Sequence, residues 1–319
     1  MNRYGLALWG LIGLAPLLGG CPRCPGPRLS LQALVAEHNA NAAGVPKLWA
    51  RARVRATFSD AKGRRLSWGS VSALAAPNAL VMLAKRDEGA SGPPDFVLIG
   101  RDVVELFRVG FSRLEDVYYM WGRLGDRGAA WLGRRALAGA PGATAVPIDA
   151  LQLLEILGVT AMPEVRPDAM PAVVMTMETD PCAYVVRYLN PQPVSGHLKI
   201  WREVWFRWDA RHPARPFRVR LFDADGLCRA VAEVGRYRPI EVGDDHAGPA
   251  PVMPTDIRVT WPAIKNVQTA SAVHLVLSEM STTHRFSKKV FLFAPPAGTP
   301  VTVVDSACKP DPRKDAPRP

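Results

Sequence analysis

Apolar and polar positions recur with a helical period in two short segments of this chain, and they alternate with a period of two in most of the rest. Residues 30–44 and 147–159 carry the helical pattern, with Ser30 and Asp149 at the positions of N-caps. Gly158 stands where the second of these segments should end. The pattern therefore predicts two helices that lie far apart in the chain.

Alternation is clearest in residues 50–58, where small and apolar residues occupy one face and three arginines occupy the other. Asp225-Gly226 is a dipeptide typical of a tight hairpin turn between two such segments. The same period predicts further strands in residues 66–76, 78–86, 94–110 (two strands), 115–125, 171–179, 182–190, 198–209, 216–223, 227–240, 256–262 and 272–282.

The order of these elements is one helix, about six strands, a second helix and about seven strands. It predicts an α+β fold that is mainly antiparallel β: a curved half-open β-barrel whose concave side is covered by the two helices. Residues 30–305 are expected to form a single domain, and residues 126–147 and 241–254, which are rich in glycine or proline, to be connections. Residues 306–319 are expected to be a disordered tail.

The first 20 residues show a different pattern. Arg3 precedes an apolar run of 14 residues, 5–18, which is shorter than the roughly 20 apolar residues that a spanning helix needs. A positive start followed by a short apolar run is typical of a secretory signal peptide. We therefore expect residues 1–20 to be removed on export.

The end of that segment resembles the lipobox of bacterial lipoproteins, with Leu18, Gly19 and Gly20 followed by Cys21. The resemblance implies cleavage between Gly20 and Cys21 and acylation of Cys21, so that residues 21–29 become a proline-rich tether. The alternative is an ordinary signal peptide followed by a disulfide cysteine. Because Pro22 and not aspartate follows Cys21, resemblance to enteric lipoproteins implies the outer membrane, with the protein facing the periplasm.

The whole layout resembles the LolA/LolB-like half-open barrels, which are periplasmic lipoprotein carriers and outer-membrane receptors. The resemblance covers roughly residues 31–282. It is carried by the opening helix, "WARARVRAT" with its hairpin "DAKGRRLSWGSVSALAAPNAL", "PDFVLIGRDVVELF", "IDALQLLEILG" and "MPTDIRVTWP". It implies a protein that binds acyl chains or hydrophobic ligands in its concave cavity and has no catalytic residues. No segment is assigned to the exposed apolar loop of the receptor-type members, so the resemblance does not extend to lipoprotein insertion.

Such a cavity would be lined by large apolar side chains beside the small Ala50, Ala52 and Ala56, although each of these residues could equally fill a core. The candidate lining residues are Trp68, Met82, Phe96, Phe107, Tyr119, Trp121 and Trp201.

Aromatic residues fall on both faces of residues 198–209, which form a tryptophan-rich strand. Strict alternation predicts Trp201 and Trp205 on one face and Phe206 and Trp208 on the other. One of these faces must pack beneath a helix or loop, or be exposed to a partner.

The composition is that of a globular protein, with 48% hydrophobic and 22% charged residues in a chain of 319. The formal charge of +11 is spread along the chain, and its richest groups, residues 51–55 and 214–220, alternate with apolar residues. No basic helix or aromatic RNA-binding motif accompanies the charge, so we expect no nucleic-acid partner. A basic face favours contact with an anionic membrane surface or envelope polymer.

The chain contains none of the motifs G-x-S-x-G, G-x-x-x-x-G-K-[ST], H-E-x-x-H or G-x-G-x-x-G, and its six histidines are scattered. Residues 243–246, "GDDH", are interpreted as a solvated loop. The sequence therefore predicts no catalytic residue, no metal and no cofactor.

Four cysteines remain if Cys21 is acylated, and they allow three pairings in an oxidising compartment. They are Cys24, Cys182, Cys228 and Cys308. The C-x-x-C spacing of Cys21 and Cys24 is interpreted as coincidental, with Cys24 a free thiol on the tether, and no bridge is assigned.

Together these observations predict a lipid-anchored envelope protein that binds a hydrophobic or acylated ligand, a lipid or a lipoprotein, without catalysis. One alternative is a structural module that docks a partner through its tryptophan-rich strand or basic face. A second is a hydrolase whose catalytic groups meet only in the fold.

Overall fold

The computed structural model describes residues 24, 28–59, 65–68, 79–85, 93–101, 105–124, 127–135, 150–158, 160–163, 172–192, 196–208, 214–223, 225–244, 246–264 and 270–304. Helix α1 spans Leu31–Ala43 and α2 spans Ala150–Leu157. The strands that precede α2 are β1 (Lys47–Ser59), β2 (Arg65–Trp68), β3 (Ala79–Lys85), β4 (Asp95–Arg101), β5 (Glu105–Ser112), β6 (Val117–Leu124) and β7 (Arg127–Arg134). The strands that follow it are β8 (Ala172–Thr179), β9 (Cys182–Pro191), β10 (Leu198–Arg207), β11 (Pro216–Phe222), β12 (Cys228–Gly235), β13 (Arg238–Pro239), β14 (Val252–Met253), β15 (Asp256–Trp261), β16 (Ser271–Ser281) and β17 (Val301–Val304).

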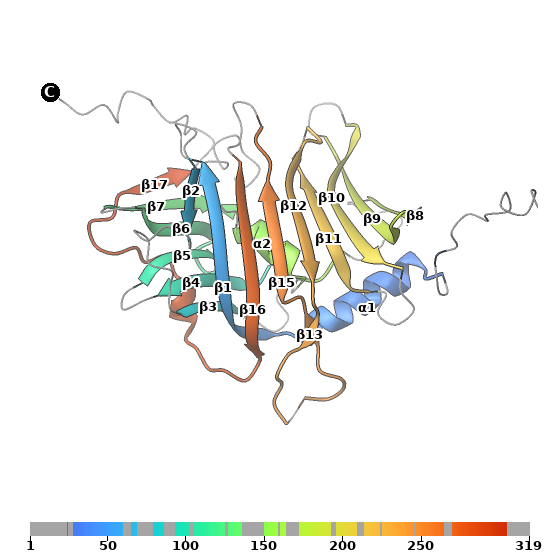
Figure 1. Cartoon of the computed structure of the whole chain (residues 1–319), viewed down its shortest axis with the longest axis horizontal. Coiled ribbons are helices and arrows are strands. Elements are labelled where there is room, and N and C mark those ends of the chain that lie inside the picture. The colour runs from blue at the N-terminus through green and yellow to red at the C-terminus, as the bar shows by residue number, and fades with distance from the viewer. Residues whose placement is uncertain are drawn as a thin grey trace, which may run out of the picture.

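Fifteen of the described strands form one sheet, in the order β17-β7-β6-β5-β4-β3-β1-β16-β15-β12-β11-β10-β9-β8, with β2 added to β1 (Figure 1). Every pairing in this sheet is antiparallel except that of β17 with β7. The outermost strands β17 and β8 lie at opposite ends of the sheet, so it is not closed into a barrel. The predicted fold class, a curved and half-open antiparallel sheet with two helices, is confirmed.

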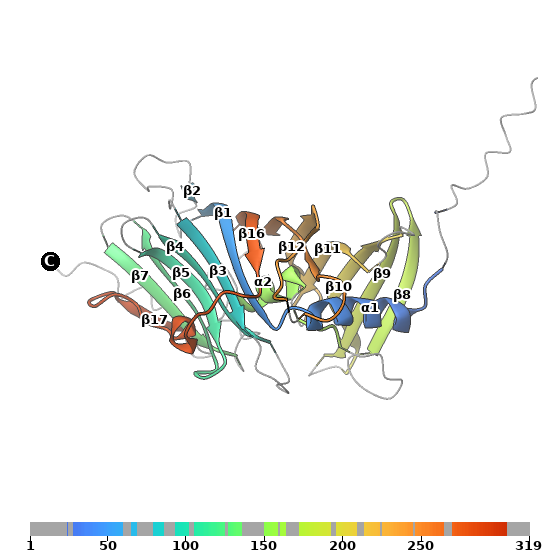
Figure 2. The same cartoon turned by 90° about the horizontal axis from the view of Figure 1, so that it is seen from below.

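Both helices lie on the concave side of the sheet, α2 between its two arms and α1 along the β8–β11 arm (Figure 2). The buried apolar side chains of this side form one cluster, which includes Leu34 of α1, Leu154 of α2, Val109 of β5 and Val204 of β10. Burial of about 25 cal/mol for each Å² of apolar surface makes this shared cluster the main stabilising contribution to the fold. The helices are therefore integral to the core.

The convex face of the β3–β6 arm is covered by the segment that follows β16. Phe291, in a 3₁₀ helix at Lys288–Phe291, packs with Leu83, Val97 and Ile99 as a second buried cluster. The backbone carbonyl of Phe291 accepts a hydrogen bond from Tyr119 Oη at 2.8 Å. We call this segment, residues 286–299, the C-terminal cover. No element was predicted after residue 282, so the sequence did not predict the cover.

Strand β7 shows that residues 127–134 are not the connection that their glycine and alanine content predicted. Small residues are needed here because β7 packs closely on the aromatic strand β6. A Cβ atom at Gly133 would overlap the ring of Tyr118. Similarly, residues 252–253 of the predicted loop form β14, which pairs with β13.

Two local predictions are confirmed. The Asp225-Gly226 turn joins β11 to β12, with Asp223 Oδ1 accepting from the backbone nitrogen atoms of Asp225 (3.0 Å) and Leu227 (2.9 Å). Gly226 has φ +80°, a conformation that glycine adopts without strain. Alternation in β1 also holds, since Arg51 and its neighbours at 53 and 55 are exposed. The predicted signal peptide, residues 1–20, and tail, residues 306–319, lie outside the described residues.

Candidate functional site

A cavity of about 460 Å³ lies between the C-terminal half of α1, the end of α2 and the segment 246–254. Its walls are mostly apolar and include Ala40, Leu157, Ala214 and Val252. The volume falls within the roughly 300–1,000 Å³ of typical small-molecule sites, which are concave and largely apolar. This cavity is the candidate site.

Two asparagine side chains of α1 hold the helix at the edge of the cavity. Asn39 exchanges two hydrogen bonds with the backbone of Met162, Nδ2 donating to O at 2.9 Å and Oδ1 accepting from N at 2.7 Å. Asn41 exchanges the same two bonds with Val252, at 2.9 and 2.8 Å. Asn41 therefore fixes α1 to the segment 246–254 on the facing wall, and Asn39 fixes it to the segment that follows α2.

His38 lies between the cavity and the sheet. Its side chain lines the cavity, is 4% exposed and meets Phe206 edge-on with ring centroids 6.0 Å apart. Burial, and secondarily the charge of Arg202, lowers the pKa of His38 to about 4. The imidazole is therefore neutral at pH 7.

Stability should consequently fall as the pH drops from about 6.5 to about 4. In this window the unfolded chain binds a proton at His38 that the folded protein does not bind. The resulting loss in the free energy of unfolding approaches about 3 kcal/mol. Urea denaturation at a series of pH values measures it. His38→Leu should remove this part of the slope, whereas His197→Leu, at an exposed position, should keep it. An unchanged slope in His38→Leu would contradict the assignment.

Beyond His38, a donor cluster formed by Tyr188, Trp201 and Arg202 lies on the concave face of β9 and β10. Arg202 stands opposite Tyr188 in the β9–β10 ladder, with its Cζ 5.9 Å from the centre of the Tyr188 ring. The rings of Tyr188 and Trp201 have centroids 6.0 Å apart. A β-bulge between Ile200 and Arg202 lets the consecutive residues Trp201 and Arg202 both belong to this group.

The donor cluster lacks acceptors. Among the described residues, Tyr188 Oη, Trp201 Nε1 and Arg202 Nε are buried and have no hydrogen-bond partner. Arg202 is 3% exposed and donates from an NH2 group to the backbone carbonyl of Glu155 in α2 at 3.5 Å. Burial raises the pKa of Tyr188 to about 12, so its hydroxyl keeps its proton at neutral pH. Buried polar groups are nearly always hydrogen-bonded, so this group is unusual.

No protein-family model and no curated protein matches the chain. Solved structures do match it, including a domain described as an outer membrane lipoprotein-sorting protein from Vibrio parahaemolyticus. It is 13% identical, with a TM-score of 0.43, and the match covers 82% of this chain and 95% of that one. A DUF1329 family protein from Desulfovibrio piger is 14% identical over 82% and 95% of the two chains, with a TM-score of 0.48.

A third match is to a protein from Nitrosomonas europaea, 10% identical over 83% of this chain and 99% of that one, with a TM-score of 0.42. That protein is a member of the LolA superfamily. The resemblance predicted from the sequence is therefore found among solved structures as well. At these identities and TM-scores the fold description still rests on the strand order and register of this chain itself.

The seven candidate lining residues do not meet in one place. Met82, Phe96 and Phe107 lie in the concave core cluster, at most 4% exposed. Tyr119 and Trp121 lie on the opposite face of the sheet, beneath the C-terminal cover, where Trp121 Nε1 donates to Thr299 Oγ1 at 3.4 Å.

The two remaining candidates are Trp201, which belongs to the donor cluster, and Trp68, whose side chain is outside the described part of the structure. None of the six candidates whose side chains are described is among the residues that line the 460 Å³ cavity. These residues were selected by alternation, which assigns side chains to one face of a strand only where the strand has no bulge. Alternation also does not indicate which of the two faces is concave.

The bulge also changes the prediction for the tryptophan-rich strand. Trp201 packs against the concave cluster, and so do Phe206 and Trp208. Trp205 lies on the other face, where Nε1 donates to Glu203 Oε2 at 3.4 Å and the Arg218 guanidinium lies 5.6 Å from the ring. The prediction that Trp201 and Trp205 share a face is therefore wrong.

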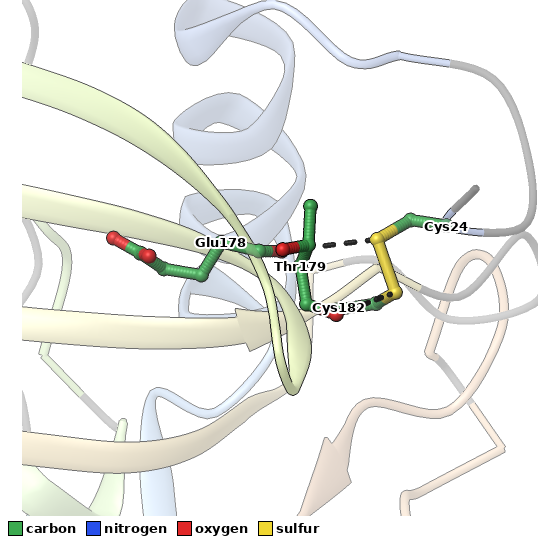
Figure 3. Close-up of a disulfide and its surroundings, with 4 residues drawn as sticks. All are labelled: Cys24, Glu178, Thr179 and Cys182. Carbon is green, nitrogen blue, oxygen red and sulfur yellow. Dashed lines mark hydrogen bonds between the residues drawn. A yellow bond between two sulfur atoms is a disulfide. The ribbon is translucent and has the colours of Figure 1, made fainter. Parts of the chain in front are cut away.

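A disulfide joins Cys24 to Cys182, 158 residues apart, and ties the N-terminal segment to the turn between β8 and β9 (Figure 3). The interpretation of Cys24 as a free thiol is therefore wrong. Among the described cysteines Cys228 is free, as one of the open alternatives allowed. Cys21 and Cys308 lie outside the described residues.

Carboxylates neutralise much of the convex basic face. Glu203 accepts from Arg187 Nε at 2.8 Å and from Arg220 NH1 at 3.0 Å, and Arg218 pairs with Glu233 at 3.3 Å. The sheet therefore presents alternating charges here, which does not favour a polyanion-binding surface.

In the part of the chain that the structure describes, no three histidine, cysteine, aspartate or glutamate side chains come together as metal ligands. The same residues include no helix with the length and hydropathy required to cross a bilayer.

Proposed function

We propose that this chain is a lipid-anchored envelope protein that binds a hydrophobic or acylated ligand, a lipid or a lipoprotein, without catalysis. The observation that supports the proposal is the apolar cavity of about 460 Å³ between α1, the end of α2 and residues 246–254. Asn41 and Val252 both line this space and are joined by two hydrogen bonds, so a ligand would not need to order this side of the cavity.

The disulfide supports the proposed location in the cell envelope. Structural disulfides persist in oxidising compartments such as the periplasm and are rare in the bacterial cytosol. The Cys24–Cys182 bridge therefore supports export by the predicted signal peptide, on which the proposed acylation at Cys21 and attachment to the outer membrane on its periplasmic side depend.

Native mass spectrometry tests ligand binding. The mature domain, purified from its own envelope, should carry a lipid-sized adduct. Ala40→Trp places a large side chain in the cavity wall from an exposed position and should remove the adduct. Ala43→Trp, at an exposed position of the same helix outside the cavity lining, should retain it. A wild-type protein without an adduct would contradict the proposed ligand binding.

The proposed anchor has its own test. Cys21→Ser should release the protein from membranes to the soluble fraction, because a thioether-linked lipid cannot form on serine. Cys228→Ser, at the free cysteine, is the matched control and should stay membrane-bound. If Cys21→Ser fractionates with membranes as the wild type does, the lipoprotein assignment is wrong.

A further inference from the structure

We propose that the donor cluster of Tyr188, Trp201 and Arg202 receives the anionic head of the bound ligand, a carboxylate or a phosphate on an apolar chain. The inference rests on the proposed ligand binding and narrows it. The acyl groups of a lipoprotein are held by neutral amide and ester bonds, so the cluster selects a free anionic lipid over acylated protein.

The charge of Arg202 is the first argument. A buried guanidinium is costly unless a carboxylate or another anion accompanies it. The other buried arginine among the described residues, Arg229, follows this rule, because its guanidinium lies 3.7 Å from the Asp223 carboxylate. The partly buried Arg108 pairs with Glu105 at 2.8 Å. Among the described residues Arg202 forms no such ion pair. An anionic group of a bound ligand would supply the missing partner of its guanidinium.

The three donors of the cluster also favour an anion. An indole N–H and a guanidinium N–H can only donate, and a protonated tyrosine hydroxyl donates readily. Trp201 Nε1, Arg202 Nε and Tyr188 Oη therefore offer three donors with no acceptor among the described residues. Carboxylate and phosphate oxygen atoms are pure acceptors, and their bonds to a charged donor are stronger than neutral ones. A neutral ester also offers a carbonyl acceptor but no charge, so the cluster favours the anionic group.

The position of His38 is the third argument. Its side chain lines the cavity, and it also interacts electrostatically with Arg202. The donor cluster does not line the cavity, but it lies close to it, on the far side of His38. A ligand whose chain occupies the cavity would direct its head past a neutral imidazole toward the guanidinium.

Binding of paired lipids to the delipidated mature domain tests the proposal. Oleic acid should bind about 10- to 100-fold more tightly than methyl oleate, which has the same chain without the charge. Lysophosphatidic acid distinguishes a phosphate head from a carboxylate head, and inorganic phosphate alone should bind weakly because it lacks the chain. Arg202→Met should abolish the preference for acid over ester and leave the ester affinity unchanged.

The control is Arg53→Met, which removes the same charge from an exposed position on the convex face and should keep the preference. Tyr188→Phe provides a second variant if Arg202→Met does not fold, and it should reduce acid binding several-fold without changing ester binding. Equal affinity of the wild type for acid and ester, or an unchanged preference in Arg202→Met, would overturn the inference while leaving ligand binding intact. Absence of binding by every lipid would instead overturn the proposed function.

Discussion

Replacing Phe206 with alanine should lower the free energy of unfolding by about 3–5 kcal/mol. The side chain is fully buried in the concave cluster and meets the edge of His38, so its loss leaves a cavity between β10 and α1. Urea denaturation of the mature domain, with the disulfide intact, measures the change. A loss of less than about 1 kcal/mol would show that α1 does not depend on this contact.

The neighbouring residue on the opposite face is the control. Trp205 is partly buried, and its indole contacts Glu203 and Arg218 at the convex surface. Trp205→Ala should therefore cost less, about 1–2 kcal/mol. A larger loss for Trp205→Ala than for Phe206→Ala would contradict the assignment of concave and convex faces.

The second large effect concerns the disulfide. Cys24→Ser should lower the free energy of unfolding by about 2–4 kcal/mol, because the bridge restricts an unfolded loop defined by residues 158 positions apart. Thermal unfolding with and without a reductant measures the change. The unfolding temperature of the reduced wild type should equal that of Cys24→Ser without reductant.

Cys228→Ser is the matched variant, since it removes a thiol that forms no bridge. It should keep the wild-type sensitivity to the reductant. Should thiol labelling of the unfolded, unreduced wild type modify both Cys24 and Cys182, the bridge is absent in solution.

Local patterns in the sequence were sufficient for much of this fold. Ser30 accepts from Ala33 N at 3.1 Å, so the predicted cap of α1 is present. The alternation in β1 and the turn at Asp225-Gly226 are also local, and each follows from a few neighbouring residues. Antiparallel hairpins connect such elements over short distances, which is why the order of strands led to the correct fold class.

Long-range contacts account for what the sequence did not predict. The composition of β7 resembles a loop until the ring of Tyr118 is placed against Gly133. The C-terminal cover is fixed by Phe291 and Tyr119, residues 172 positions apart. No periodicity within one segment contains that information.

The candidate site was missed for a similar reason, although part of its signal is present in the sequence. Arg202 precedes Val204 and Phe206 at intervals of two, so a charged residue stands on an apolar face of the strand. That irregularity is the sequence signal for the proposed anion-binding cluster beside the cavity. The bonds of Asn39 and Asn41, in contrast, reach residues 123 and 211 positions away, and nothing local indicates them.

The disulfide limits the distance between the domain and anything attached at Cys21. Three peptide units join Cys21 to Cys24 and can span at most about 11 Å, so the bridge keeps Cys21 within about that distance of Cys24 at the β8–β9 turn. The cavity lies at this same end of the strands, because Arg215 and Pro216, at the start of β11, line it. If Cys21 carries the proposed lipid, the end of the strands at which the cavity lies is therefore held within a short distance of the bilayer.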